Sequence, residues 1–343
     1  MKEPILGKTL DELQELVSRM AEPRFRARQI AEWIYQKGAT TFDEMTNLSK
    51  ALREKLNQFY IVGRTLPTVT SVSKDGTEKY LFGCIEEPSQ LFETVYIPEG
   101  DRATICVSSQ VGCKMNCHFC ATGKMGFHTN LTTCDIINQV LSIPHSDKLS
   151  NLVFMGMGEP LDNYDVVFHA IEILTAEYGF AWSPKRITVS TIGIRLGLKR
   201  LLADTTVHVA ISLHNPFSHE RAKLMPVEQA YPIQNILKIL EQHDFSGQRR
   251  LSFEYIVFGG VNDTQEHAEK LIQLLSPLDC RVNLIRYHST PGVSLSPTSE
   301  SQILWFENYL NRNGLRCTIR RSRGEDIAAA CGMLAVHRTS VKQ

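Results

Sequence analysis

Three cysteines lie within one short stretch of this chain, which reads Cys113-Lys114-Met115-Asn116-Cys117-His118-Phe119-Cys120. The residues before it, 102–111, have the pattern of a strand, and the residues after it, 121–130, are small and polar and predict a loop. In a core strand the cysteines would alternate with apolar side chains, whereas polar residues separate them here. The stretch therefore indicates a compact inorganic centre held by a loop. Three thiolates can hold three irons of a [4Fe–4S] cluster and leave the fourth iron open.

A structural zinc site is the main alternative, because thiolates also suit zinc. Such a site needs a fourth ligand, which usually comes from a second close pair of cysteines. No second Cys-x-x-Cys occurs in the sequence, and His118 and His128 are the nearby candidates for that ligand. The spacing favours the iron–sulfur cluster and leaves zinc open.

Composition places the chain among ordinary globular proteins, with 343 residues of which 43% are hydrophobic and 22% charged. Since 37 Lys and Arg balance 37 Asp and Glu, any nucleic-acid binding must come from local basic patches. The first eight residues lack the apolar core of a signal peptide, and no apolar run is long enough to span a membrane. Nine cysteines without a secretion signal predict the reducing cytoplasm.

Residues 1–62 predict a small helical domain. Thr9 and Glu12 have the spacing of a capping box, and apolar residues at helical spacing follow them. Two more helices are expected, over residues 25–36 and 49–59. Arg24, Arg26 and Arg28 alternate at the start of the second helix, where they either form a solvated helix end or contact phosphate.

Residues 63–100 predict a β-rich linker segment, with short antiparallel strands at 68–72, 78–82 and 91–97. Beyond residue 101, expected helices alternate with expected strands at 102–111, 151–155, 186–190, 207–213, 251–258, 281–287 and 315–321. This alternation predicts the α/β class and a parallel sheet. Six parallel strands and one more make an open or partial (β/α)6-type barrel over residues 101–343. In such barrels the chemistry lies at the C-terminal ends of the strands.

Polar and glycine-rich segments follow several of these strands, as the barrel interpretation requires. They are Met155-Gly156-Met157-Gly158-Glu159-Pro160, Ser190-Thr191-Ile192-Gly193, Ser212-Leu213-His214-Asn215 and Arg286-Tyr287-His288-Ser289. Glycines allow the backbone to approach a ligand closely, and the residue before a proline is held extended. The carboxylate of Glu159 then suits an ammonium ligand, although a turn with a solvated glutamate has the same pattern.

These motifs resemble those of radical S-adenosylmethionine (SAM) enzymes. Cys113, Cys117, Phe119 and Cys120 fill the pattern Cys-x-x-x-Cys-x-aromatic-Cys, and Gly158–Glu159 follows the second strand. Nearly the whole chain is similar to the RlmN/Cfr family of radical SAM RNA adenine methyltransferases. It is most similar to the RlmN branch, which methylates adenine C2 in 23S rRNA and tRNA. The further matching segments are residues 25–30, 44–49, 93–98, 106–113, 155–161 and 323–332.

The resemblance implies a radical SAM partial barrel with an N-terminal helical accessory domain that is a candidate for RNA binding. Cys113, Cys117 and Cys120 would bind one [4Fe–4S] cluster per chain. The implied SAM contacts are Gly158, Glu159, Ser190, Ser212, Leu213, His214 and His288. The family often has Asn where this chain has His288, and Gln where it has Met333.

The resemblance also implies a mechanism that consumes two SAM molecules per turnover. One methylates Cys331, and the other yields a 5′-deoxyadenosyl radical that removes a hydrogen from that methyl group. The resulting radical adds to adenine, Glu93 accepts a proton, and Cys106 releases the product as a Cys106–Cys331 disulfide forms. A radical route suits adenine C2 because this carbon is electrophilic and SAM cannot methylate it directly. Without the resemblance, Cys106 and Cys331 would be interpreted as packing residues.

The implied substrates are adenosine 2503 of 23S rRNA and adenosine 37 of tRNA, with a flavodoxin or ferredoxin as electron donor. Pro160 favours C2 methylation, because the branch that methylates C8 tends to have Ala there. Three alternatives stay open: C8 methylation of the same rRNA adenosine, a radical SAM enzyme with another substrate, and a zinc-stabilised RNA-binding protein without catalysis. We expect a cytoplasmic location and no membrane association.

Overall fold

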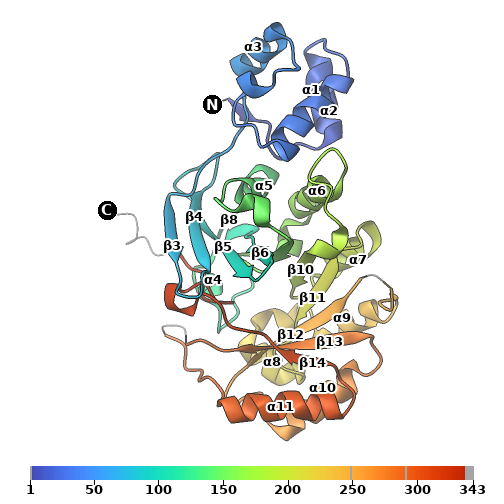
Figure 1. Cartoon of the computed structure of the whole chain (residues 1–343). Helices are drawn as coiled ribbons and strands as arrows, with labels where there is room; N and C mark the ends of the chain where they lie inside the picture. Colours follow the sequence, from blue (N-terminus) through green and yellow to red (C-terminus); the bar gives the residue numbers. More distant parts are fainter. Residues whose placement is uncertain (1, 248, 290–291, 337–343) are drawn as a thin grey trace.

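A mixed ten-stranded sheet organises the computed structural model, which describes residues 2–247, 249–289 and 292–336 (Figure 1). The strand order is β14-β13-β12-β11-β10-β9-β6-β5-β4-β3. Seven neighbouring strands are parallel: β6 (Arg102–Cys106), β9 (Asn151–Phe154), β10 (Ile187–Thr191), β11 (His208–Ser212), β12 (Leu251–Val257), β13 (Cys280–Arg286) and β14 (Cys317–Ile319). Because β14 and β3 are the two edges of the sheet, the barrel is open. The α/β partial barrel expected from the sequence is confirmed.

The expected antiparallel strands continue the sheet beyond β6. They are β3 (Val69–Val72), β4 (Glu78–Gly83) and β5 (Leu91–Glu99). The parallel strands are buried on both faces, as they must be when helices cover one face and a filled interior covers the other; every residue of β12 is buried. The covering helices are α5 (Thr133–Leu141), α6 (Tyr164–Thr175), α7 (Arg195–Asp204), α9 (Ile233–Leu240), α10 (Gln265–Leu275) and α11 (Glu300–Arg312).

The N-terminal helices lie at one end of the molecule, beyond α5 and α6 (Figure 1). They are α1 (Leu10–Arg19), α2 (Phe25–Ala31) with a π-helical continuation (Glu32–Gln36), and α3 (Lys50–Phe59), and the short strands β1 (Glu3–Pro4) and β2 (Tyr60–Ile61) pair beside them. The Thr9–Glu12 capping box is present. Arg64 joins this part to the barrel, because its guanidinium donates to the carbonyls of Gly38 and Leu141, both at 2.6 Å.

The segment around the cysteines differs from the expectation. The single strand expected over residues 102–111 is divided, since β6 ends at Cys106 and β7 (Gln110–Gly112) pairs instead with β8 (Phe127–Asn130). The expected loop over residues 121–130 contains α4 (Ala121–Lys124) and β8. The physical reason is a close crossing of β7 and β8: a Cβ on Gly112 would lie 1.7 Å from the carbonyl oxygen of Gly126. The three cysteines therefore lie on a loop whose two ends are held together by the pairing of β7 with β8.

Residues 320–336, which we call the C-terminal segment, cross from β14 to the opposite edge of the sheet (Figure 1). Asp326 accepts hydrogen bonds from the Ser73 hydroxyl at 2.5 Å and the Lys74 amide at 3.2 Å, just after β3. The Gly324 amide donates to Asp75 at 3.1 Å. These contacts place the C-terminal segment across the open side of the barrel. Within the described ranges, no helix is long and apolar enough to cross a membrane.

Candidate active site

A cavity of about 150 Å³ lies at the C-terminal ends of the parallel strands. It brings together the three cysteines and most of the residues expected to contact SAM. Its lining includes Cys113, Cys117, Cys120, Gly158, Glu159, Ser190, Ser212 and His214. These residues come from the cysteine loop and from the segments that follow β9, β10 and β11, which is the arrangement expected of a barrel active site. We call this the first cavity.

Two of the residues expected to contact SAM are not part of the described lining of this cavity. Leu213 is fully buried, and its backbone joins neighbouring elements: its amide donates to Glu254 and its carbonyl accepts from Arg221. His288 lines a different cavity, where its ring nitrogens contact the Ser322 hydroxyl at 2.8 Å and the Glu325 carboxylate at 3.0 Å. The structure therefore groups His288 with the C-terminal segment.

The three cysteine side chains fit a cluster. All are free thiols, and burial raises the pKa of Cys113 to about 12 and also raises the pKa values of Cys117 and Cys120. Thiolates at these positions need a cation to balance them, and the irons of a cluster supply it. Family membership, shown below, implies this cluster.

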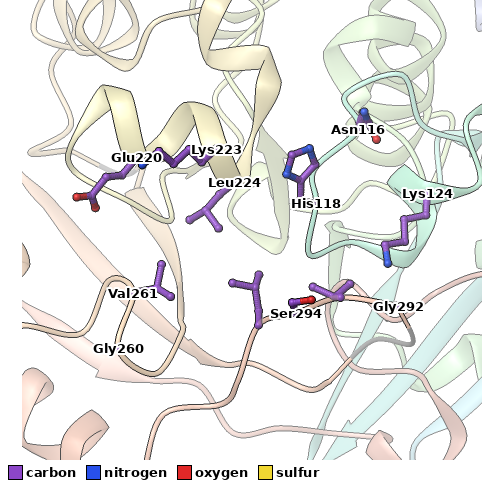
Figure 2. A pocket seen from close by; sticks show the side chains of 12 residues that line it. Asn116, His118, Lys124, Glu220, Lys223, Leu224, Gly260, Val261, Gly292 and Ser294 are labelled. Atoms are coloured by element: carbon purple, nitrogen blue, oxygen red, sulfur yellow. The ribbon is translucent and has the colours of Figure 1, made fainter.

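The two histidines considered as zinc ligands do not belong to the described lining of the first cavity. In the part of the chain that the structure describes, no three His, Cys, Asp or Glu side chains converge to hold one metal ion. His118 lines another cavity, of about 660 Å³, together with Asn116, Lys124 and Lys223 (Figure 2). Alternate residues of the loop thus face two different cavities. His128, the other zinc-ligand candidate, is exposed on β8.

The Gly158–Glu159 turn is packed against the segment between β6 and β7. The Glu159 amide donates to Gln110 at 2.9 Å, while its buried carboxylate accepts from the Thr191 hydroxyl at 2.5 Å and from the amides of Leu161 and Ile192, both at 3.0 Å. Burial raises the pKa of Glu159 to about 7, and these donors oppose that shift. The carboxylate is held in one orientation, and a positive ligand would stabilise its charged form.

Gly158 supplies a testable constraint. Its φ is +100°, and an added Cβ would lie 2.6 Å from the Cβ of Gln110. We expect Gly158→Ala to lower the free energy of unfolding by about 3 kcal/mol, since backbone strain and overpacking each cost about 1–3 kcal/mol. Denaturant unfolding of the cluster-free protein measures this.

Gly100→Ala is the matched control, because Gly100 has φ +56° and nothing within 4 Å of an added Cβ. This control measures the cost of the left-handed backbone conformation alone, which is about 1–2 kcal/mol. Equal losses in the two variants would contradict the argument from packing.

His214 is a neutral imidazole within the first cavity. Its Nδ1 accepts from the Ile256 amide at 3.0 Å, so its proton is on Nε2. Its ring meets the Phe119 ring edge-on at 4.9 Å. Burial and, to a smaller extent, the Arg221 charge lower the pKa of His214 to about 3. The side chain can therefore present an N–H donor at neutral pH.

This depressed pKa predicts a pH dependence of stability. The unfolded His214 gains a proton below its ordinary pKa of 6.5, whereas the folded one does not until about pH 3. Stability is therefore fully present above pH 6.5 and is lost as the pH falls, by up to about 1.4 kcal/mol per unit. Unfolding free energies of cluster-free wild type and His214→Asn, measured from pH 7 to 4, should converge at that rate. Parallel curves would refute the assignment. His219→Asn, at a 72% exposed side chain, is the control.

A second cavity, of about 410 Å³, adjoins the first. Cys106 and Cys331 both line it, and Cys331 also lines the first cavity, so the two thiols that the resemblance pairs do face a common space. Burial raises the pKa of the Cys106 thiol, and the positive charge of Arg320 opposes this shift. The C-terminal segment that carries Cys331 is fixed to the cysteine loop, since the Ala121 amide donates to Gly332 and the Thr122 hydroxyl donates to Leu334.

Glu93 is buried on β5 and contacts the C-terminal segment. Its carboxylate lies 3.0 Å from the Lys79 ammonium and accepts from the Ala335 amide at 3.1 Å. Lys79 in turn donates to the Ala328 carbonyl at 3.4 Å. Glu93 therefore contacts Ala335, which lies four residues after Cys331 in the sequence. Glu93 is not part of the described lining of either cavity.

Sequence reasoning missed two charged residues at the site. Glu254 lines the first cavity from the middle of the apolar strand β12, and this carboxylate within an apolar run was a readable signal. Arg221 is fully buried on α8 (Ser218–Leu224), a helix that was not expected. Its guanidinium donates to the carbonyls of Ser212 and Leu213, which end β11. No sequence signal distinguished it from a solvated arginine.

Comparisons with known proteins agree with this geometry. Residues 4–62 match the family described as the ribosomal RNA large subunit methyltransferase N-terminal domain, and residues 107–275 match the radical SAM superfamily. A crystal structure of a radical SAM methyltransferase from Sphaerobacter thermophilus is 39% identical, covers 97% of this chain and 99% of that chain, and has a TM-score of 0.90. Fold and site together define a radical SAM enzyme.

Relatives narrow the assignment. A Bacteroides thetaiotaomicron protein named "Probable dual-specificity RNA methyltransferase RlmN" is 56% identical over 97% of this chain and 96% of its own length. The "Dual-specificity RNA methyltransferase RlmN" of Geobacter sulfurreducens is 42% identical over 96% and 91%. The chain belongs to the RlmN family of radical SAM RNA methyltransferases, and its activity is SAM-dependent methyl transfer. Family membership implies a [4Fe–4S] cluster and SAM, and it overturns the zinc-stabilised, non-catalytic alternative.

Proposed function

We propose that this protein methylates C2 of an adenosine in 23S rRNA, and of an adenosine in tRNA, through a methyl group carried on Cys331. The observation that carries the proposal is the position of Cys331 between the two cavities, with the three cluster cysteines lining one and Cys106 lining the other. A methyl carrier must meet the methyl source on one side and the base on the other. The names of the relatives support dual specificity.

SAM bound at the cluster supplies both the methyl group and the radical that activates it. The residues of the chain do the rest. Cys113, Cys117 and Cys120 hold the cluster, and Gly158, Glu159, Ser190, Ser212 and His214 line the space for SAM. His214 offers its Nε2–H to the ligand. Leu213 acts through its backbone, which fixes the end of β11, and His288 acts at the second cavity.

The release of product uses the thiol pair and Glu93. In the proposed step the radical adduct returns one electron to the cluster, and the carboxylate of Glu93 takes the proton from C2 of the resulting closed-shell adduct. The Cys106 thiolate then attacks the Cys331 sulfur, the bond between that sulfur and the new methyl carbon breaks, and its electron pair returns to the base, which takes up a proton. The Cys106–Cys331 disulfide that remains is oxidised by two electrons and must be reduced before the next turnover. Arg320 stabilises the thiolate.

The second cavity is the proposed site of the target base. Arginines surround it, from β6 and from the C-terminal segment: Arg102, Arg320, Arg321 and Arg323. Guanidinium groups at the entrance suit the phosphates of RNA. Arg249, by contrast, donates to the Leu202 carbonyl at the end of α7 and serves the fold. A base must leave its stack to enter, so the target is a loop or is remodelled.

Three further proposals accompany this function. Residues 1–62 form an accessory domain that contacts RNA, residues 63–100 a β-rich linker, and residues 101–343 the catalytic barrel. A flavodoxin or ferredoxin reduces the cluster. The protein acts in the cytoplasm, where nine free cysteines in the described chain stay reduced.

Mass spectrometry of rRNA and tRNA fragments tests the proposal. We expect a deletion strain to lose 2-methyladenosine from both RNAs and the wild-type gene to restore it. Retention of 2-methyladenosine in the deletion strain refutes the assignment. Loss of 8-methyladenosine instead would assign the C8 reaction, and unchanged RNA would indicate another substrate for this radical SAM site.

A further inference from the structure

Glu254, which lines the first cavity, has one carboxylate oxygen to which no described residue donates a hydrogen bond. Glu254 is buried, with 3% of its surface exposed, and it lines the cavity. Its Oε1 is fully engaged, because it accepts from the Asn283 amide at 2.7 Å and the Ser252 hydroxyl at 3.1 Å. Its Oε2 accepts no hydrogen bond from any described residue. A buried acceptor left in this state is costly, so a ligand that donates to it gains that energy.

The nearby arginine does not satisfy this oxygen. The Nε of Arg320 lies 3.4 Å from Oε2, which balances charge without forming a hydrogen bond. Arg320 approaches from the second cavity, whose lining it shares with Cys106 and Cys331. Oε2 can therefore still accept a hydrogen bond from a ligand.

The register of the sheet directs Glu254 toward the ligand. Glu254 on β12 is paired with Ser212 on β11 and with Asn283 on β13. Residues paired across neighbouring parallel strands point to the same face, so Ser212 and Glu254 point together into the barrel. Both line the first cavity. Glu254 thus extends the row of polar groups that the site offers to SAM.

Two buried carboxylates line this cavity from different strands. Glu159 follows β9, and its two oxygens accept from Thr191, Leu161 and Ile192. Glu254 lies on β12 close to Ile256, which also lines the cavity. The cavity thus combines apolar surface that suits a nucleobase with a carboxylate oxygen that can accept from a hydroxyl beside it.

From this geometry we infer that Glu254 Oε2 accepts a hydrogen bond from a ribose hydroxyl of SAM. Carboxylates are suited to this role, as in the ribose contacts of dinucleotide-binding folds. The inference requires SAM binding alone. It does not depend on which RNA atom is methylated, and failure of the proposed function would leave it standing.

Glu254→Met tests the inference, because methionine has nearly the length of glutamate, does not donate a hydrogen bond and accepts one only weakly, whereas the NH₂ of a glutamine could still donate to a ribose hydroxyl. The variant also leaves Asn283 and Ser252 without the acceptor Oε1, so affinities are compared only within one protein. Ser252→Ala is the matched control, because Ser252 contacts only Oε1 and does not belong to the described lining of the cavity.

The measurement is equilibrium dialysis of the cluster-loaded, unreduced full-length protein with SAM, its 2′-deoxy and 3′-deoxy analogues, and its N6-methyl analogue. We expect wild type and Ser252→Ala to bind one deoxy analogue at least about tenfold more weakly than SAM, and Glu254→Met to bind that analogue and SAM within about twofold of each other. The ratio of the affinities for SAM and for an analogue is measured on the same protein, so it does not depend on the fraction of that protein that is folded. Wild type that binds both deoxy analogues as tightly as SAM overturns the inference. The inference is also overturned if the Glu254 variant still prefers SAM to the deoxy analogues. It is overturned as well if the substitution changes the affinity for the N6-methyl analogue instead.

Discussion

Cys331→Ala should lower RNA methylation at least about a thousandfold, as expected when a covalent carrier is removed from a site whose parts act as a unit. Cys331 lines both cavities and is the one thiol among the described residues that do so, so its loss removes the proposed link between the methyl source and the base. Intact-protein mass spectrometry should show one methyl group on purified wild type and none on the variant. Cys106→Ala should fail at a later step and leave RNA attached to the protein, which a denaturing gel detects.

Cys84→Ala is the control for removing a thiol. Cys84 is a buried free cysteine that lies outside the described lining of both cavities. Its loss should leave both the protein-bound methyl group and turnover intact. If Cys331→Ala kept wild-type product formation, methyl transfer through this thiol would be wrong, although the radical SAM assignment would remain.

Glu228→Ala should lower the free energy of unfolding by about 3–5 kcal/mol, because it leaves a fully buried arginine without its counter-charge. Glu228 forms an ion pair with Arg221, whose side chain has no exposed surface. Glu228 also accepts from the Ile233 amide at 3.1 Å, at the start of α9. Denaturant unfolding of the cluster-free protein measures the loss.

The same substitution should weaken retention of the cluster. Arg221 holds the end of β11, and the last residue of its helix, Leu224, accepts a hydrogen bond from the His118 amide within the cysteine loop. The control is Asp165→Ala, which breaks the pair that Asp165 forms with Arg200 at 2.9 Å between half-exposed and exposed side chains. It should cost under about 1 kcal/mol. Equal losses in the two variants would show that burial does not set the cost.

Local periodicity was enough to predict most of the barrel. Alternating runs of apolar residues placed six of the seven parallel strands within a few residues, and polar residues after them identified the correct rim. The exception is instructive. The strand expected over residues 102–111 divides at Cys106 because Gly112 must pass against Gly126, and a contact between segments fourteen residues apart leaves no mark in the pattern of either.

The features that the sequence did not predict depend on contacts between segments that are far apart in the chain. His288 was expected at SAM from the family resemblance, and its partners Ser322 and Glu325 are in the C-terminal segment. Arg221 was overlooked because burial of a charge is decided by a partner and not by neighbours in sequence. Glu93 was assigned by resemblance, and its bonds to Lys79 and Ala335 could not be read from β5. The assignment of its chemical role remains a prediction.

The path of the C-terminal segment has a consequence for the order of biosynthesis. The chain emerges from the ribosome N-terminus first, so the cysteine loop and the strands around it are complete before Cys331 has been made. Only when residues 320–336 contact Asp75, Ser73 and Glu93 does the site gain Cys331, the proposed methyl carrier. A nascent or prematurely terminated chain can therefore contain all three cluster cysteines and still lack Cys331, and we expect such a chain not to methylate RNA. We therefore expect methyl transfer to become possible only after the C-terminal segment has been synthesised.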